Sequence, residues 1–266
     1  MHYLMESPEE TIRLDLKTNI EAVRKQALWA GVRPGMRVAD LGCGSGKTSS
    51  VLFDLVQPGG TVVGVDFAED RWNFANLHYS RPGLEFECLD IREPLAALGS
   101  FDLVWIRFVL EYYLADSAAL LTNVVKILNP GGTLCLIDLD HNCLSHYGMN
   151  DRLNQTLFEI MEVLQQKANF DPYAGRKLYS FLYDLKMENI TMEVAAHHLI
   201  FGKLKEADDF NWLKKIEVGP QKIGYGFPAY QGSYEAFLSD YKSFFHDPRR
   251  FTYTPVISCS GRKPAL

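Results

Sequence analysis

The amino-acid sequence predicts an α/β fold built on a doubly wound, largely parallel sheet, and three observations carry this prediction. First, five short apolar runs alternate with segments of helical length between residues 37 and 138. Second, strands joined by such connections pair in parallel through right-handed crossovers. Third, a Pro-Gly turn stands just before four of the runs, at Pro34, Pro58, Pro82 and Pro130.

The predicted elements of this first half follow one another in a regular order. The strand candidates are residues 37–41, 61–65, 84–89, 101–106 and 133–139. The helix candidates between them are 45–55, 68–79 and 117–128. The last of these carries apolar residues at helical spacing, which is typical of a helix packed against a sheet.

After residue 139 the alternation of strands and helices changes. A mostly helical stretch reaches residue 170, a helix candidate covers 175–187, and strand candidates follow at 190–201 and 251–261. An irregular, aromatic-rich stretch separates those two strands. We therefore expect a single domain, 1–266, with an N-terminal helical segment at 1–34, a ligand-binding half at 35–140, and insertions at 141–172 and 203–249.

Composition limits the partners and the compartment. With 27 Lys and Arg against 33 Asp and Glu, the formal net charge is −6, so no basic excess draws the chain to nucleic acid or acidic lipid. The five cysteines form no CxxC pair and are odd in number, which favours reduced thiols. The polar N-terminus is unlike a secretory signal, and no apolar run approaches the ~20 residues of a membrane span. We expect a cytoplasmic protein that acts on neither nucleic acid nor membranes.

The glycine-rich stretch LGCGSGKTSS, residues 41–50, follows the first strand candidate and could hold one of three ligand classes. A phosphate-binding loop needs a glycine five positions before Gly46, where Leu41 stands. A dinucleotide-binding turn needs its third glycine where Lys47 stands. Both patterns fail, and we expect Lys47 and Thr48 in the first turn of the following helix rather than on a phosphate.

The remaining pattern is an acidic residue followed by G-x-G-x-G. VADLGCGSG resembles motif I of the class I S-adenosylmethionine-dependent methyltransferases, and VVGVDFAED, FECLDI, FDLVWIRFVLEYY and LNPGGTLCLIDLD resemble the family's later motifs in order and spacing. The resemblance covers residues 30–140 strongly and 174–261 more loosely. It implies a seven-stranded mixed sheet with the last strand antiparallel, and helical and aromatic insertions forming a lid. It also implies S-adenosyl-L-methionine as methyl donor, with S-adenosyl-L-homocysteine as product.

The resemblance also implies a set of cofactor-binding residues. Asp66 would accept hydrogen bonds from the ribose hydroxyls, with a plain helix cap as the alternative. Asp90 would contact the adenine amino group, with a turn carboxylate as the alternative, and Asp40 would accept from loop amides or from the ligand's amino group. The full set is Asp40, Gly42, Cys43, Gly44, Gly46, Asp66, Phe67, Arg71, Asp90, Ile91 and Arg107.

Motifs that the chain lacks narrow the class of acceptor. The fourth strand is followed by IRFVLEYY, where enzymes of the family that methylate base nitrogens usually carry Asn/Asp-Pro-Pro-aromatic. No cysteine lies between Cys88 and Cys135 for cytosine C5 chemistry, and Glu111 lacks the second glutamate of the protein arginine enzymes. The chain thus resembles the group that methylates O, N or C of small molecules. The alternatives are a nucleic-acid or protein methyltransferase, or an S-adenosylmethionine-binding protein without turnover.

Glu111 is the candidate catalytic residue, because it follows the fourth strand, whose end abuts the donor methyl in this family. It would orient the acceptor or take its proton, and an i, i+4 pair with Arg107 is an equal alternative. The aromatics of IGYGFPAYQGSY lie on a loop that glycine and proline keep from being helical, so they suit a pocket rim. The expected acceptor-pocket residues are Glu111, Tyr112, Tyr225, Phe227 and Tyr230. No HExxH or CxxC-type set is present, so no metal is expected.

Overall fold

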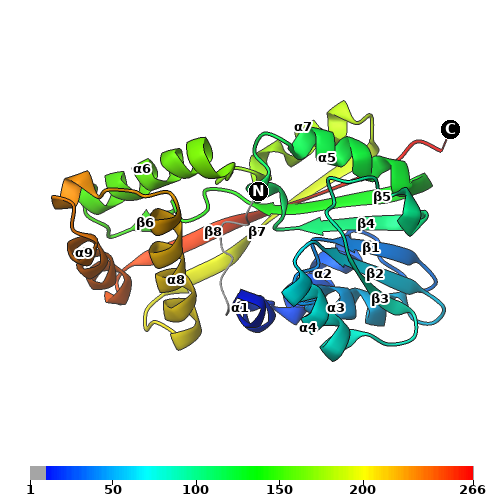
Figure 1. Cartoon of the computed structure of the whole chain (residues 1–266), viewed down its shortest axis with the longest axis horizontal. Helices are drawn as coiled ribbons and strands as arrows, with labels where there is room; N and C mark the ends of the chain where they lie inside the picture. The colour runs from blue at the N-terminus through cyan, green and yellow to red at the C-terminus, as the bar shows by residue number, and fades with distance from the viewer. Residues whose placement is uncertain (1–9, 266) are drawn as a thin grey trace.

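The computed structural model describes residues 10–265. Residues 1–9 of the predicted N-terminal helical segment, and with them most of the stretch that argues against a secretory signal, lie outside this range. The rest of the segment forms two helices, α1 (Glu10–Lys17) and α2 (Ile20–Trp29). Helix α1 lies between α8 (Glu206–Lys222) and α4 (Glu69–Tyr79) (Figure 1).

Five parallel strands form the first half of the sheet, as predicted. Their order across the sheet is β3-β2-β1-β4-β5. Their bounds are β1 Arg37–Leu41, β2 Thr61–Asp66, β3 Leu84–Cys88, β4 Phe101–Arg107 and β5 Leu128–Leu139. The topology confirms the doubly wound arrangement, so the loops after β1, β2, β3 and β4 meet at one edge, where ligands of such sheets bind.

The second half of the sheet is a long antiparallel ribbon of β7 (Glu188–Phe201) and β8 (Phe251–Arg262). Strand β8 is also antiparallel to β5, which confirms the predicted orientation of the last strand. The prediction of seven strands is one short, because a two-residue strand, β6 (His146–Tyr147), pairs with β8. Since β8 continues past the end of β5, its first residues offer a free edge that β6 occupies.

Helices cover both faces of the parallel strands. Helices α2, α3 (Lys47–Val56) and α4 (Glu69–Tyr79) pack on one face, and α5 (Ser117–Val124) and α7 (Leu178–Asp184) pack on the other. Adjacent residues of β1 show the two faces, since Val38 belongs to the first core and Ala39 to the second. Burial on both faces explains why β1, β2 and β4 are largely apolar without alternation, whereas the edge strand β3 exposes Glu85 and Glu87.

Several predicted boundaries shift by up to five residues. The predicted helix 117–128 ends as a 3-10 turn, Val125–Ile127, after which β5 begins five residues before its predicted start. The predicted helix 175–187 is a 3-10 turn, Gly175–Lys177, followed by α7. Between residues 10 and 265, no helix is long and apolar enough to cross a membrane.

The two predicted insertions fold together as a helical cap on the protruding end of the β7–β8 ribbon (Figure 1). The cap consists of α6 (Asp151–Ala168), α8 (Glu206–Lys222), the 3-10 turn Pro228–Tyr230 and α9 (Tyr234–His246). The stretch 203–249 thus contains two helices rather than irregular chain. Gly224, Gly226, Pro228 and Gly232 lie in the segment between them, whereas Gly219 and Pro220 lie within α8. Trp212, Phe237, Tyr241, Phe244 and Phe245 form the aromatic centre of the cap.

Two tyrosines of the cap differ in how their hydroxyl groups are satisfied. Tyr241 is fully buried, and its hydroxyl has no hydrogen-bond partner among the described residues. Tyr230 is also buried, but its hydroxyl donates to Asp240 Oδ2 at 2.6 Å. A buried polar group without a partner costs about 1–3 kcal/mol, whereas a hydrogen bond to a carboxylate stabilises the fold.

We therefore predict opposite effects for the same chemical change at these two positions. Tyr241→Phe is expected to raise the free energy of unfolding by about 1 kcal/mol, and Tyr230→Phe to lower it by about 1–2 kcal/mol. Urea denaturation of both variants measures this difference. Equal destabilisation by both changes would contradict the packing described for the cap.

Candidate functional site

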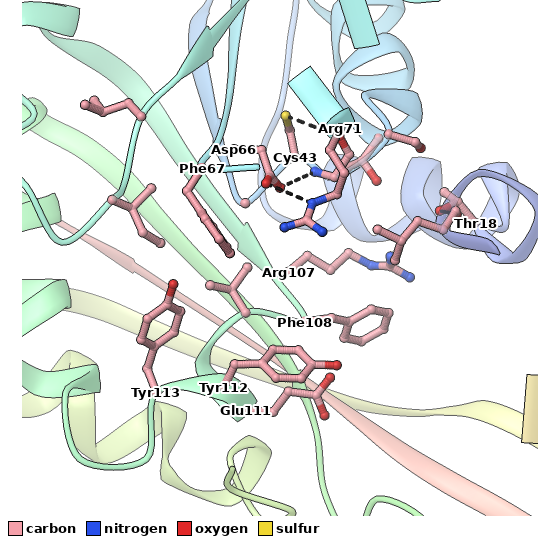
Figure 2. A pocket seen from close by; sticks show the side chains of 18 of the residues that line it. Thr18, Cys43, Asp66, Phe67, Arg71, Arg107, Phe108, Glu111, Tyr112 and Tyr113 are labelled. Carbon is pink, nitrogen blue, oxygen red and sulfur yellow. Dashed lines mark hydrogen bonds and ion pairs between the residues drawn. The ribbon is translucent and has the colours of Figure 1, made fainter. Parts of the chain in front are cut away.

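A cavity opens at the carboxyl ends of β1, β2, β3 and β4, where the topology places a ligand (Figure 2). We call it the first cavity. The glycine loop forms one side, and α1 and the segment after β4 close it. Its lining residues are Leu14, Lys17, Thr18, Gly42, Cys43, Gly44, Ser45, Thr48, Asp66, Phe67, Arg71, Leu89, Ile91, Arg92, Arg107, Phe108, Val109, Glu111, Tyr112, Tyr113 and Ala168.

The glycine loop presents bare backbone to this cavity because side chains would not fit. Gly46 has φ +85°, and a Cβ there would lie 2.8 Å from the Cβ of Ala75 on α4. A Cβ on Gly42, where φ is +80°, would overlap the side chain of Val109. Positive φ and close packing together require glycine at both positions. The loop therefore suits a ligand that lies directly against the main chain.

The carboxylate of Asp66 fixes this loop from the end of β2. Its Oδ2 accepts from the backbone N–H of Gly44 at 2.9 Å, and its Oδ1 accepts from the N–H of Ala68 at 3.1 Å. Oδ1 also accepts from Nε of Arg71 at 2.9 Å, as Figure 2 shows. Since each carboxylate oxygen accepts about two hydrogen bonds, Oδ2 retains the capacity for one more donor. A hydroxyl group of a ligand in the first cavity can be this additional donor.

Flat and apolar side chains line the next part of the cavity. The guanidinium of Arg71 lies 5.1 Å from the centre of the Phe67 ring, whose exposed fraction is 40%. Ile91 is buried and lies after β3, on the same edge of the sheet. Bare loop backbone, a carboxylate with spare acceptor capacity, and a flat apolar surface together fit an adenosyl group, so the residues present suit the implied cofactor.

Three of the expected cofactor-binding residues do not line the first cavity. Gly46 shapes the loop from behind it. Asp40 is buried and accepts from Ser49 Oγ at 2.6 Å, and burial raises the pKa of its carboxyl to about 7. The carboxylate of Asp90 is held by the guanidinium of Arg92, whose hydrogen bonds lower the pKa of Asp90. The oxygens of Asp90 face Arg92, which does line the first cavity, and the contact of Asp90 with adenine stays a prediction.

Glu111 lies in the 3-10 turn Leu110–Tyr112 that follows β4. It is 4% exposed, its Oε2 accepts from Asn142 Nδ2 at 2.7 Å, and its N–H donates to Asp138 Oδ2 at 3.1 Å. Burial raises the pKa of Glu111, while the charges of Lys215 and Lys17 oppose this rise.

Arg107 contacts a different residue, so the alternative of an Arg107–Glu111 pair is not what the structure has. Its Nε donates to Gln26 Oε1 at 3.1 Å, and its guanidinium lies over Phe108. Phe108 has φ +60°, which is unfavourable for a bulky residue and turns the chain between the two charged groups. Arg107 and Glu111 therefore reach the first cavity separately.

A second cavity adjoins the first and lies between the sheet and the cap. The two cavities share Lys17, Phe108, Glu111 and Tyr112. The remaining residues of the second cavity are Arg13, Leu139, Asn142, Cys143, Met161, Leu164, Phe170, His197, His198, Asn211, Lys215 and Gly219. Helices α6 and α8 of the cap supply one wall, so the cap completes a site that the sheet begins.

The aromatic loop of the cap is placed differently from the expectation. Tyr225, Phe227 and Tyr230 line neither cavity and pack in the aromatic core of the cap. The hydroxyl of Tyr225 donates to Glu159 at 2.6 Å, and the Phe227 ring packs 4.9 Å from that of Phe237. These partners hold the three side chains inside the cap. The expected acceptor-pocket residues that do line the second cavity are Glu111 and Tyr112.

The residues of α1 and α8 that complete the site were not predicted from the sequence, because polar residues on amphipathic helices have no motif. Lys47 lies in the first turn of α3, as expected, and donates to the carbonyl oxygen of Asp15 at 2.7 Å, which joins α1 to this helix. In the part of the chain from residue 10 to 265, no three His, Cys, Asp or Glu residues gather in a way that could hold a metal ion.

Comparison with known proteins agrees with this geometry. Over 110 residues the chain is 38% identical to a ubiquinone biosynthesis O-methyltransferase from Dinoroseobacter shibae, covering 41% of this chain and 43% of that protein. It is 30% identical over 200 residues to a demethylmenaquinone methyltransferase from Lactococcus lactis, covering 74% of this chain and 68% of that protein. The match to the first of these relatives thus spans less than half of that relative's length.

A solved structure shares the fold at low sequence identity. A phosphoethanolamine N-methyltransferase from Haemonchus contortus, in complex with phosphomonomethylethanolamine and S-adenosylhomocysteine, superposes with a TM-score of 0.54 and 17% identity. The superposition covers 92% of this chain and 52% of that one. The methyltransferase domain family matches residues 33–199, a range that contains β1 to β5 and nearly all of β7. The chain therefore belongs to the methyltransferase domain family.

Proposed function

We propose that this protein transfers the methyl group of S-adenosyl-L-methionine to an oxygen, nitrogen or carbon atom of a small-molecule acceptor. The observation that carries the proposal is the junction of the two cavities at Phe108, Glu111 and Tyr112. A cavity with the glycine loop of the family opens there into a second cavity walled by the cap. Methyl transfer mainly requires that donor and acceptor be aligned at contact distance with water excluded, and adjoining cavities meet that requirement.

The first cavity supplies the donor side of the proposal. Bound S-adenosylmethionine would supply an electrophilic methyl group, and S-adenosyl-L-homocysteine would remain after transfer. The loop from Gly42 to Ser45 would support the ligand with main chain, and Asp66 would accept from a ribose hydroxyl through Oδ2. Phe67 and Ile91 would flank the base. No residue of this set needs a metal ion for binding.

The second cavity supplies the acceptor side. Its position between the sheet and helices α6 and α8 favours a small molecule, because a nucleic acid or protein segment needs an open groove. The formal net charge of −6 also argues against nucleic acid. The relatives from Dinoroseobacter shibae and Lactococcus lactis carry the names of quinone methyltransferases, which agrees with a small acceptor. In this proposal the insertions 141–172 and 203–249 cover the acceptor.

Glu111 is our candidate for the general base. Its carboxylate faces both cavities, and one oxygen is oriented by Asn142. Burial raises its pKa, so the ionised carboxylate is a stronger base than an exposed one. It would take the proton from an acceptor hydroxyl or amine as the methyl group is transferred.

The cellular location in this proposal is the cytoplasm. The five cysteines are free thiols, which agrees with a reducing compartment.

A role of Asp66 in binding the ribose can be distinguished by experiment from its support of the glycine loop. Asp66→Ala is expected to weaken binding of S-adenosylhomocysteine by roughly 1–3 kcal/mol, as a lost charged acceptor would. The same change is expected to cost much less with an analogue that lacks both ribose hydroxyls. Calorimetry with the two compounds measures this, and Asp70→Ala, an exposed position at the start of α4, is the matched control. Equal losses with both compounds would assign Asp66 to loop support alone.

The role of Glu111 is tested by turnover. With methyl-labelled S-adenosylmethionine and a panel of small phenols, amines and enols, Glu111→Gln is expected to lower kcat about 10²–10⁴-fold. Its affinity for S-adenosylhomocysteine should stay within about twofold of the original protein. Because the base must be ionised and burial raises its pKa above 4.5, kcat/KM of the original protein should rise with pH through that raised value. A variant with full turnover would show that positioning alone carries the reaction.

A further inference from the structure

We propose that the second cavity selects acceptors that carry one carboxylate group, and that the ammonium groups of Lys17 and Lys215 bind it. The inference rests on the proposed function, because it names the class of acceptor that the same site takes. It begins from the charges that line the cavity. They belong to Arg13, Lys17, Glu111 and Lys215, with His197 and His198 beside them.

Three of these residues, Arg13, His197 and His198, contribute no unpaired positive charge. Arg13 donates through Nε and Nη2 to the two carboxylate oxygens of Glu10, both at 2.7 Å, and through Nη1 to Asn211 Oδ1 at 2.8 Å. The pair of Arg13 and Glu10 is therefore neutral as a unit. Burial lowers the pKa of His197 and of His198 well below the ordinary value, so both rings are uncharged at neutral pH.

The two lysines lack a carboxylate of their own. Across residues 10–265, the ammonium of Lys17 has no hydrogen-bond or ion-pair partner. The ammonium of Lys215 donates to Asn142 Oδ1 at 3.2 Å and to Cys143 Sγ at 3.7 Å, and lies 5.1 Å from the centre of the Trp212 ring. All three of these partners are neutral, since burial raises the pKa of the Cys143 thiol.

The pKa of Lys17 is lowered by its surroundings in the cavity. Burial, with the positive charges of Arg13 and Lys215, lowers the pKa of its ammonium to about 7, although Glu10 and Glu111 act in the opposite direction. A cation that is partly desolvated and has no ion-pair partner among the described residues behaves in this way. A bound anion would restore the ordinary pKa and stabilise the charged form.

The balance of charge determines the class of ligand. When both lysines are protonated, they face one carboxylate, Glu111, and leave one positive charge in excess. A monoanion neutralises this excess, whereas a phosphate dianion would leave a buried negative charge. A carboxylate has two oxygens and can therefore accept from both lysines at once. Met161, Leu164 and Phe170 supply apolar walls for the rest of the acceptor.

The test uses benzoate and its uncharged isostere benzamide as probes. Each is titrated into the full chain saturated with S-adenosylhomocysteine, so that the first cavity is filled, and binding is followed by ligand-observed NMR. Benzoate is expected to bind at least about tenfold more tightly than benzamide. Lys215→Met and Lys17→Met should each reduce benzoate affinity about tenfold or more, with benzamide affinity unchanged.

Lys214→Met is the matched control, because Lys214 lies on the same helix, pairs with Glu217 at 3.3 Å, and lines neither cavity. It should leave the preference for benzoate intact. Equal affinity for the two probes, binding of neither, or a preference that survives in both cavity variants would overturn the assignment. Circular dichroism of every protein reports folding, because Lys17 also lines the first cavity, and S-adenosylhomocysteine affinity is measured beside it. Its absence in the original protein would count against the proposed function, whereas its presence without a benzoate preference counts against the carboxylate site alone.

Discussion

The hydrogen bond from the N–H of Gly44 to the carboxylate of Asp66 is the contact on which the rest of the site depends. It joins the loop after β1 to the end of β2, and Arg71 on α4 binds the same carboxylate. The loop is held at backbone angles that only glycine adopts easily, so an acceptor at its far side is needed to keep it in place. The carboxylate of Asp66 thus holds together the loop after β1, the end of β2 and helix α4, and these three segments shape the first cavity.

The second constraint is the length of the β7–β8 ribbon. Because β8 continues beyond β5, the ribbon carries the cap outward from the parallel strands, and α6 and α8 come to face the segment after β4. Glu111 stands where these parts meet, with its backbone held by Asp138 of β5 and its side chain by Asn142. In the proposed function, the sheet positions the methyl donor in the first cavity, and the cap adds a second cavity for the acceptor with a different set of charged residues.

The parts of the site that depend on the local order of residues could be predicted from the sequence. The strand, glycine loop and helix around Gly42, and the acidic residue at the end of β2, are set by neighbours in sequence, so their place at the sheet edge could be predicted. The direction of a side chain in the cap depends on packing with residues far away in the sequence, which local patterns do not show. Tyr225 and Phe227 were expected to line a pocket, but they pack inside the cap. Lys17 and Lys215 are far apart in the sequence and belong to no motif, so no sequence pattern could predict that they line the same cavity.

The central claim is that the donor occupies the first cavity and that its reacting end faces the second. A crystal structure of the protein with S-adenosylhomocysteine tests this claim most directly. The account predicts the adenosyl group between the glycine loop and Phe67, a ribose hydroxyl within 3.2 Å of Asp66 Oδ2, and the sulfur directed toward Glu111 at the junction of the cavities. Density for the ligand outside the first cavity, or a sulfur turned away from Glu111, would contradict it.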